Sequence, residues 1–277
     1  TISAHKMISP IFADFIAGAG EVYSKAGYHM VLNMVSEEDE DACYSELAAK
    51  RSVDGIIVHG PRVPETRIKH LKEIGLPFIM HGRAPGEEES YAWMDVDNKR
   101  AFLRATNFLL DLGHTRIALI NGFEDMNFAV RRREGYEQAL HDHGLLADLN
   151  IMHSDELTEP FGYTTTTEML KAPNPPTAIL VSSVISAMGA RRAIRDLNMV
   201  VGKDVSIITH DDELTFLQNS GEVPMFTCTR SSIRLAGKRN AEMLLDIIAN
   251  PDTALQHDLW EAQLTVGEST GPAPSKA

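Results

Sequence analysis

Cysteine is scarce in this sequence of 277 residues, because Cys43 and Cys228 are the only two. A framework of disulfides and a cysteine-based zinc site are therefore not expected, and so low a content suits a reducing cytosol. No apolar run reaches the roughly 18 residues that a membrane-spanning helix requires. No charged and then apolar leader follows Thr1, so the sequence does not indicate secretion.

Basic residues are outnumbered, since 26 Lys and Arg stand against 39 Asp and Glu, for a net charge of −13. Phosphate binding requires a basic face, so this balance argues against nucleic-acid binding by this chain alone. The excess of acidic residues does not exclude a separate DNA-binding module in a longer protein. The hydrophobic content of 43% allows sizeable cores. The length exceeds the roughly 100–200 residues of one domain and favours two lobes or one large α/β domain.

Short apolar runs alternate with amphipathic helical segments along most of the chain. Runs such as "VDGIIV", "LPFIMH", "TRIALING" and "PTAILVS" predict buried strands, and segments such as "NKRAFLRATNFLLDLG" and "ISAMGARRAIRDLN" predict helices. This alternation is typical of parallel sheets covered by helices, and the number of units predicts two doubly wound α/β lobes. We also expect strands at "YHMVLNM" and "HDLWEAQLTV", and a disordered tail at "GESTGPAPSKA".

Residues that follow each apolar run are the first candidates for a binding site, because doubly wound sheets bind ligands beyond the carboxyl ends of their strands. These positions are 6–9, 59, 81–83, 95–98, 121–127, 182–183 and 210–213. The last of them, in "IITHDDELTF", brings an imidazole and acidic groups to one strand end. The residue types alone leave a metal site, an acid–base pair and a hydrogen-bonding clamp for a polar ligand open.

Several enzyme motifs are missing from the sequence. "GAG" at 18–20 falls inside a predicted helix rather than after a strand, so it is not the dinucleotide-binding fingerprint. No nucleophile elbow of the G-x-S-x-G type is present. The histidines show no paired metal-ligand spacing on a convincing helix. The residue types still leave a metal site and an acid–base pair open, and the expectation of no cofactor, no metal and no catalytic residues comes from the family resemblance below.

Nine segments resemble, in order and spacing, the LacI/GalR (lactose-repressor) family of bacterial transcription regulators. They are "AKRSVDGIIV", "LPFIMHGR", "VDN", "DLGHTRIALING", "RRREGYEQAL", "PPTAILVSS", "MGARRAIRDLNM", "DVSIITHDD" and "LAGKRNAEMLLDII", and together they cover nearly the whole chain. The resemblance implies the ligand-sensing core of that family. This core is similar to type I periplasmic sugar-binding proteins, with two Rossmann-like lobes joined by three crossovers.

The family topology also implies how the chain divides. One lobe would hold residues 1–97 and 229–255, the other 98–228 and 256–277, with a ligand cleft between them. The family's helix-turn-helix and hinge helix would be absent from this chain, which explains how an acidic chain can belong to a DNA-binding protein. The resemblance further implies a cytoplasmic homodimer that binds operator DNA through that helix-turn-helix and responds to a small-molecule effector.

Two residues match the family's ligand contacts most directly. Asp211 matches an acid that commonly hydrogen-bonds the effector, and a carboxylate can accept hydrogen bonds from two hydroxyls at once. A turn or a helix cap is its alternative role, and we expect the neighbouring Asp212 to shape the turn. Arg132, in "RRREGYEQ", matches the ligand-binding arginine, whose guanidinium can donate two parallel bonds. Its alternative is a solvated basic run.

Five further positions complete the ligand site that the resemblance implies. Asp97 matches a sugar contact of some members or caps the following helix. His59 matches a position that is polar in sugar-binding members, and an exposed loop histidine is its alternative role. Phe12 aligns with an aromatic residue near the cleft, and its two alternative roles are stacking on a sugar and packing of the first helix. Arg83 lacks the acid that usually precedes it. Ser183 stands where many members have Asn-Asp, which predicts a pocket with its own specificity.

The leading interpretation is the effector-sensing domain of a LacI-type regulator that binds a small polar ligand. A saccharide is the expected class, because the Asp, Arg, His and Ser groups suit hydroxyls. A solute-binding protein of a sugar transport system is the alternative, since it has the same fold. An enzyme acting on sugars is the third hypothesis, and it would need convergent acid–base residues.

Overall fold

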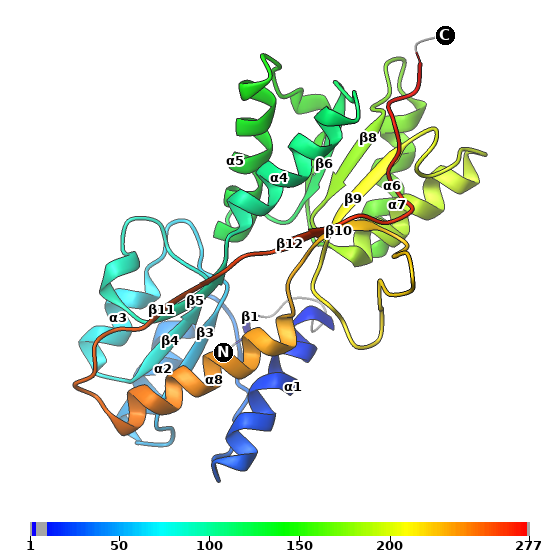
Figure 1. The fold of residues 1–277 in the computed structure, drawn as a ribbon. Helices are drawn as coiled ribbons and strands as arrows, with labels where there is room; N and C mark the ends of the chain where they lie inside the picture. Colours follow the sequence, from blue (N-terminus) through cyan, green and yellow to red (C-terminus); the bar gives the residue numbers. More distant parts are fainter. Residues whose placement is uncertain (1, 4–9, 276–277) are drawn as a thin grey trace. The chain divides into compact units, whose positions relative to one another are not determined.

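The computed structural model describes residues 2–3 and 10–275, and its internal contacts divide the chain into two compact units (Figure 1). Unit 1 comprises Thr1–Val96 and Ser232–Trp260, and unit 2 comprises Asp97–Ser231 and Glu261–Ala277. The chain therefore passes between the units three times. The possible strand end at 6–9 lies outside the described residues.

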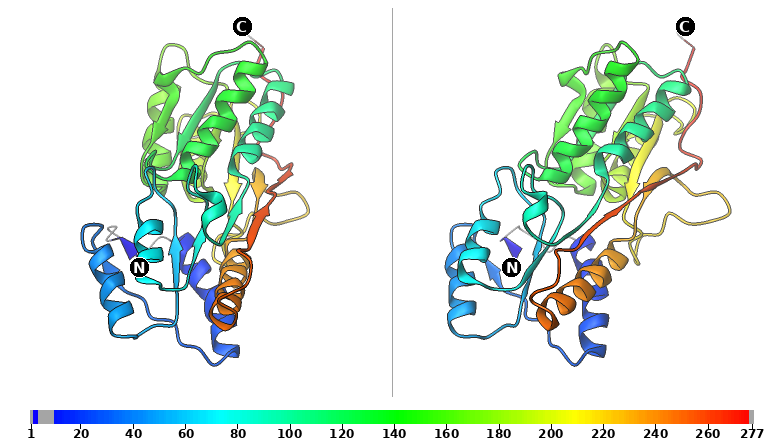
Figure 2. Two further views of the ribbon diagram at one scale, coloured as in Figure 1. Left: turned by 90° about the vertical axis from the view of Figure 1, so that its left-hand side faces the viewer. Right: turned by 60° about the vertical axis from the view of Figure 1, so that its left-hand side comes forward.

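Unit 1 contains a four-stranded parallel sheet in the order β11-β5-β4-β3, labelled in Figure 1 and seen from two further sides in Figure 2. Its strands are β3 (Ile56–His59), β4 (Phe78–His81), β5 (Trp93–Val96) and β11 (His257–Trp260). Its helices are α1 (Pro10–Lys25), α2 (Glu40–Ala49), α3 (Arg67–Ile74), α8 (Ile233–Ala249) and the 3-10 helix η1 (Glu88–Ser90). A separate two-stranded parallel sheet pairs β1 (Ile2–Ser3) with β2 (Met34–Val35). Side chains from the sheet, α2 and α3 form one buried cluster that includes Tyr44, Val58, Ile68, Leu71 and Met80.

Unit 2 contains a six-stranded sheet in the order β12-β10-β9-β8-β6-β7, parallel except for the antiparallel edge strand β12. Its strands are β6 (Ile117–Asn121), β7 (Met152–Ser154), β8 (Ala178–Val181), β9 (Ser206–Asp211), β10 (Thr227–Arg230) and β12 (Gln263–Thr265). Every residue of β6, β8 and β9 is buried, as expected of parallel strands covered on both faces. The predicted α/β fold with two mainly parallel sheets is confirmed.

Helices cover both faces of the unit 2 sheet, with α4 and α5 on one side and α6 and α7 on the other (Figure 1). They are α4 (Asn98–Asp111), α5 (Asn127–Asp142), α6 (Glu159–Lys171) and α7 (Val184–Asp196), with the 3-10 helix η2 (Leu149–Ile151) before β7. Each pair packs backbone to backbone at a glycine. A Cβ at Gly135 would lie 2.1 Å from the carbonyl oxygen of Lys99, and one at Gly162 would lie 2.0 Å from that of Ser186. Only glycine allows the helices to approach this closely.

Two of the predicted strands differ in the structure. In "YHMVLNM" only Met34 pairs in a sheet, and the side chains of Met30 and Val31 are 41% and 62% exposed. Among residues 2–3 and 10–275, no strand pairs with residues 28–33 to bury this apolar run. "HDLWEAQLTV" is two strands rather than one, because β11 is the edge strand of unit 1 and β12 that of unit 2.

The prediction of a disordered tail is wrong for residues 267–275, because this segment is hydrogen-bonded along unit 2. The hydroxyl of Ser269 donates to the carbonyl of Ile207 at 2.5 Å, and the amide of Ala273 donates to the carbonyl of Leu112 at 2.8 Å. A Cβ at Gly271 would lie 2.1 Å from the carbonyl oxygen of Gly202. The small residues that suggested disorder allow close backbone packing instead.

Candidate functional site

Buried polar side chains gather where the parallel strands of unit 2 end. Asn121 is the last residue of β6, Ser182 follows β8, and Asp211 is the last residue of β9; all three are at most 1% exposed. The hydroxyl of Ser182 donates to Oδ1 of Asn121 at 2.6 Å, and Nδ2 of Asn121 donates to the carbonyl of Ala129 at 2.9 Å. This carboxyl edge, where such folds bind ligands, is therefore fixed by hydrogen bonds in advance.

Arg132 extends from α5 to this carboxyl edge and is only 6% exposed. Its Nε donates to Oδ1 of Asn98 at 2.7 Å, and its Nη1 donates to the carbonyl of Ser182 at 2.6 Å. The guanidinium also lies over two aromatic rings, at 5.2 Å from the centroid of Phe102 and 5.0 Å from that of Phe128. These contacts fix the orientation of the guanidinium, and such fixation reduces the entropy lost on binding.

Asp211 is 1% exposed, and both of its carboxylate oxygens have protein partners. Oδ1 accepts a hydrogen bond from the amide of Glu213 at 2.9 Å, and Oδ2 accepts one from Nε of Arg230 at 3.2 Å. Glu213 has a positive φ of 54°, which is uncommon for a residue other than glycine. The carboxylate therefore fixes the turn that follows β9, and its contact with a ligand stays a prediction.

Asp212 and His210 are also buried, at 8% and 2% exposed. Burial raises the pKa of the Asp212 carboxyl to about 7, although the Arg132 guanidinium lowers it. Burial lowers the pKa of His210 well below its usual range, so this imidazole is neutral at pH 7. Its Nδ1 is 3.0 Å from the hydroxyl of Thr229, and its Nε2 is 3.2 Å from that of Ser231 and 3.6 Å from Oδ1 of Asp212.

Ser183 and Asp97 cap helices of unit 2. Ser183 is fully buried, and its hydroxyl accepts a hydrogen bond from the amide of Ile185 at 3.2 Å, at the start of α7. Asp97 accepts one from the amide of Arg100 at 3.1 Å, at the start of α4. The capping role considered for Asp97 is confirmed. The ligand contacts expected of both residues stay predictions.

The carboxyl edge of the unit 1 sheet is aromatic. His59 and His81, the last residues of β3 and β4, lie side by side with their Nδ1 atoms 3.0 Å apart. The ring centroid of Phe12 is 5.1 Å from that of His59, and the ring of Phe15 is 4.7 Å from that of His81. Burial lowers the pKa of His59 to about 4 and lowers that of His81 well below its usual range.

Two neutral imidazoles that share a hydrogen bond between Nδ1 atoms have opposite tautomers. In one ring Nδ1 carries the proton and donates, which leaves Nε2 as an acceptor. In the other ring Nδ1 accepts, so Nε2 carries the proton and can donate. The His59–His81 pair therefore has one Nε2 donor and one Nε2 acceptor, which complements the two functions of a hydroxyl group.

Arg83 also lies near the carboxyl ends of the unit 1 strands. Its Nε donates to Oδ2 of Asp95 at 2.9 Å, and its guanidinium carbon lies 5.1 Å from the centroid of the Trp93 ring. The family's usual acid before this arginine is missing, because the preceding residue is Gly82. Asp95 on β5 is instead the acid that pairs with Arg83. Its ligand contact stays a prediction.

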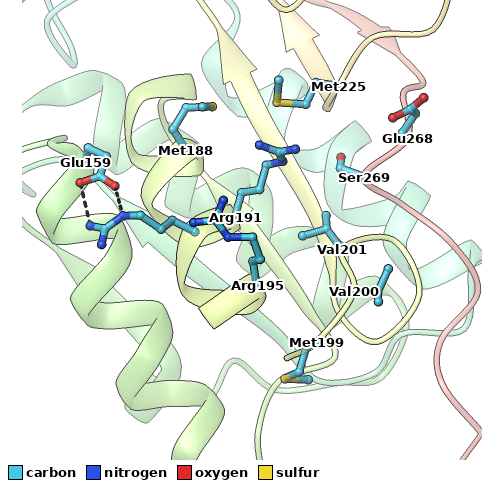
Figure 3. A pocket seen from close by; sticks show the side chains of 11 residues that line it. Glu159, Met188, Arg191, Arg195, Met199, Val200, Val201, Met225, Glu268 and Ser269 are labelled. Carbon is cyan, nitrogen blue, oxygen red and sulfur yellow. Dashed lines mark hydrogen bonds and ion pairs between the residues drawn. The ribbon is translucent and has the colours of Figure 1, made fainter. Parts of the chain in front are cut away.

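A groove of about 510 Å³ lies elsewhere on unit 2, along α7 (Figure 3). It is lined by Glu159, Met188, Arg191, Arg192, Arg195, Met199, Val200, Val201, Met225, Glu268 and Ser269. Arg192 is held there by Glu159, with Nε 2.7 Å from Oε1, and by the face of Tyr163. None of the seven predicted ligand-binding residues lines this groove, so it is distinct from the carboxyl edge.

The described residues contain no group of three or more His, Cys, Asp or Glu side chains that could hold a metal ion. Neither cysteine forms a disulfide, and burial raises the pKa of the Cys228 thiol to about 11. Across residues 2–3 and 10–275, none of the helices combines the length and the apolar character that a membrane span demands.

Sequence reasoning did not assign two residues of these edges to the ligand site. His81 was one of the residues after an apolar run, and the matching ends of "DGIIVH" and "PFIMH" on adjacent parallel strands could have paired it with His59. Asp212 was expected to shape the turn, whereas Asp211 makes the hydrogen bond across the turn. No sequence signal distinguishes the two aspartates, because Arg230, the partner of Asp211, follows 19 residues later.

Comparison with known proteins identifies relatives of one kind. The model of the periplasmic binding protein-like domain family matches residues 106–270. The chain is 42% identical over 266 residues to the HTH-type transcriptional regulator AglR of Rhizobium meliloti (strain 1021), covering 96% of this chain and 75% of AglR.

Solved structures agree with this likeness. The structure of the transcriptional regulator CelR–cellobiose complex superposes with a TM-score of 0.81 at 28% identity, covering 94% of this chain and 79% of that one. A LacI family transcriptional regulator from Enterococcus faecium, solved with bound ribose, superposes with a TM-score of 0.79 at 25% identity and covers 96% of both chains. All three proteins are transcriptional regulators.

Proposed function

Because this chain belongs to the LacI family of transcriptional regulators and carries its periplasmic binding protein-like domain, we propose that it senses a saccharide effector and thereby alters operator binding. The observation that carries the regulator assignment is the 42% identity with AglR along 96% of the chain. A transport-type binding protein would share the fold, but the named relatives are regulators of transcription.

The effector class follows from the chemistry of the two carboxyl edges. Arg132 brings a fixed array of donors in unit 2, and the His59–His81 pair brings one donor and one acceptor in unit 1. Phe12 adds an aromatic ring beside His59, and such rings stack on the apolar face of a sugar. The CelR structure contains cellobiose and the Enterococcus faecium structure contains ribose, which supports a saccharide.

We assign ligand contacts to the carboxyl edge of each unit taken by itself. Arg132 is the first candidate in unit 2, and His59 with the neighbouring ring of Phe12 is the first candidate in unit 1. Asp211, Asp97, Ser183 and Arg83 are the further predicted contacts, and each of them also has a hydrogen-bonding role within the protein.

The proposal extends to the whole regulator. It would act in the cytoplasm as a homodimer without enzymatic activity, and would contact operator DNA through a helix-turn-helix. The net charge of −13 supports a separate DNA-binding head, because the domain itself has no excess of basic residues for phosphates. Ligand would shift the equilibrium between two arrangements through its different affinity for each.

A thermal-shift screen tests the effector class, with cellobiose, maltose, sucrose, ribose and adenosine as probes. A ligand that binds only the native state stabilises it by about 2.7 kcal/mol at 100 times its Kd, so at least one sugar is expected to raise Tm. Arg132→Lys should abolish that rise, because the planar guanidinium is lost. Arg191→Ala, on the exposed surface of α7, is the matched control and should keep it. A rise with adenosine and with no sugar would contradict the saccharide assignment.

A further inference from the structure

A cluster of buried ionic side chains, comprising Arg67, Glu40 and Glu65, lies beside the loop that follows β3. Each of the three side chains is at most 5% exposed. Nε and Nη2 of Arg67 donate to the two carboxylate oxygens of Glu65 at 2.8 and 2.5 Å, and Nη1 lies 3.4 Å from Oε1 of Glu40. Buried ion pairs add little net stability, and their best-attested effect is to specify one conformation. The conformation that this cluster can specify is that of the adjacent loop.

The loop of residues 60–66 connects His59, at the end of β3, to Arg67, at the start of α3. Nη2 of Arg67 also donates to the carbonyl of Gly60 at 2.9 Å. Gly60 directly follows His59 and has a positive φ of 66°, a backbone conformation that favours glycine. Arg67 therefore binds the backbone at the point where the chain turns after His59.

The same turn contacts the end of β4. The amide of Gly60 donates to the carbonyl of His81 at 3.1 Å. A Cβ at Gly82, the residue after His81, would lie 2.4 Å from Cδ of Pro61, so the proline ring packs against the backbone there. The position of this turn therefore affects both histidines of the pair described above.

The His59–His81 pair depends on close alignment. Its Nδ1 atoms are 3.0 Å apart, and a hydrogen bond weakens steeply when its donor and acceptor are misaligned. Burial and, after it, the positive charge of Arg67 lower the pKa of His59 to about 4, so this ring is neutral at pH 7. With both rings neutral, the pair has one Nε2 donor and one Nε2 acceptor. A displaced turn would break this arrangement.

We propose that Arg67 is a positioning residue for the ligand edge of unit 1, because its hold on Gly60 fixes the His59–His81 pair as one donor and one acceptor. Arg67 is only 4% exposed, and it acts through the backbone of the loop rather than by contact with the ligand. The inference rests on the proposed function, which makes the pair a ligand contact.

Arg62 provides a matched control within the same loop. Its guanidinium pairs with Glu40 and Glu37, and in the described part of the chain it makes no hydrogen bond to Gly60. Arg67→Lys and Arg62→Lys both keep a positive charge and lose the planar array of donors. Only Arg67→Lys disturbs the hold on Gly60, because a single ammonium group cannot reproduce the donors that bind Glu65 and Gly60 together.

Nitrogen-15 NMR of the imidazole rings provides a readout without ligand. Wild type should show His59 and His81 as opposite tautomers, with the signals assigned from His59→Gln and His81→Gln. Arg67→Lys should replace this signature by rings that exchange between tautomers, whereas Arg62→Lys should keep it. Opposite tautomers that persist in Arg67→Lys, an equal loss in Arg62→Lys, or their absence from wild type each overturns the inference.

Calorimetry with cellobiose, maltose, sucrose and ribose measures the effect on binding. For a sugar that wild type binds, Arg67→Lys should weaken affinity roughly 10-fold, about the effect of one lost hydrogen bond, and Arg62→Lys by less than about 2-fold. Equal losses in the two variants contradict the positioning role. If wild type binds none of the four sugars, the saccharide assignment fails, and the tautomers still decide whether Arg67 positions the pair.

Glu65→Gln is the second variant, and it decides the matter if circular dichroism shows that Arg67→Lys is unfolded. The amide keeps the size of the side chain and one acceptor for Arg67, but it lacks the charge that holds the guanidinium. The tautomer signature should weaken in the same direction as in Arg67→Lys. An unchanged signature in folded Glu65→Gln counts against the inference.

Discussion

Removal of the ionisable group at position 212 should stabilise the protein at alkaline pH. The pKa of the Asp212 carboxyl is raised from 3.8 to about 7 by burial. A difference of about 3 units corresponds to about 4 kcal/mol, since each unit is worth about 1.4 kcal/mol. Asp212→Asn keeps the size of the side chain but cannot ionise. We therefore expect the variant to be more stable than wild type by about 4 kcal/mol at pH 8.

The stability of wild type relative to Asp212→Asn should fall as the pH rises. The pKa of Asp212 in the folded protein lies above its unfolded value, so below pH 3.8 both states keep the proton and the group costs nothing. As pH rises from there to about 7, the unfolded chain releases its proton first and wild type loses stability. The advantage of the variant should therefore fall to about 2 kcal/mol at pH 5.

Circular dichroism is the appropriate assay. Both tryptophans, Trp93 and Trp260, belong to unit 1, so tryptophan fluorescence reports on that unit, whereas Asp212 lies in unit 2. Thermal melts followed by ellipticity should show a rise in Tm of roughly 8–16 °C at pH 8, at roughly 2–4 °C per kcal/mol. Parallel stability curves for wild type and Asp212→Asn between pH 5 and pH 8 would refute the reasoning, because they would show that Asp212 is ionised in both states.

Two further substitutions test the packing and the buried charges. Gly135→Ala should lower the free energy of unfolding in urea by about 1–3 kcal/mol, because its Cβ would meet the carbonyl oxygen of Lys99. Gly20→Ala is the control and should be neutral or stabilising, because its Cβ would have no atom nearer than 3.7 Å. Arg67→Met should cost about 3–5 kcal/mol in the same assay, because buried Glu65 loses its cation and buried Glu40 loses one of its arginine partners. Lys69→Ala, with a side chain 82% exposed, should change stability by less than about 0.5 kcal/mol.

The sequence predicts the strands well where the apolar residues of the strand itself indicate that it is buried. The runs "IALIN", "AILV" and "SIITHD" become β6, β8 and β9, and every residue of those strands is buried. The prediction fails where the structure of a segment depends on a hydrogen-bonding partner elsewhere in the chain. "YHMVLNM" is also rich in apolar residues, yet within the described part of the chain no strand pairs with it before Met34. The tail at 267–275 depends on hydrogen bonds to β9, β10 and the end of α4, and composition does not encode those partners.

The prediction of the site residues is limited in the same way. Arg132 could be identified from "RRREGYEQ", because a helical register fixes which of three arginines points inward. The difference between Asp211 and Asp212 could not be predicted, since it depends on Arg230 from the neighbouring strand. His81 was a candidate by its place after an apolar run, but its pairing with His59 depends on the register of β3 and β4. Each missed contact joins residues that are distant in sequence.

The edge strands β11 and β12 affect how this protein is made. They follow each other closely along the chain, and each completes a different sheet. While the ribosome is still translating earlier residues, both sheets lack their last strand, and the backbones of β5 and β10 remain unpaired on one side. Unpaired strand edges of this kind recruit other chains and lead to aggregation. Until residues 257–265 pair with them, the free edges of β5 and β10 are therefore the places where we expect the nascent protein to pair with other chains.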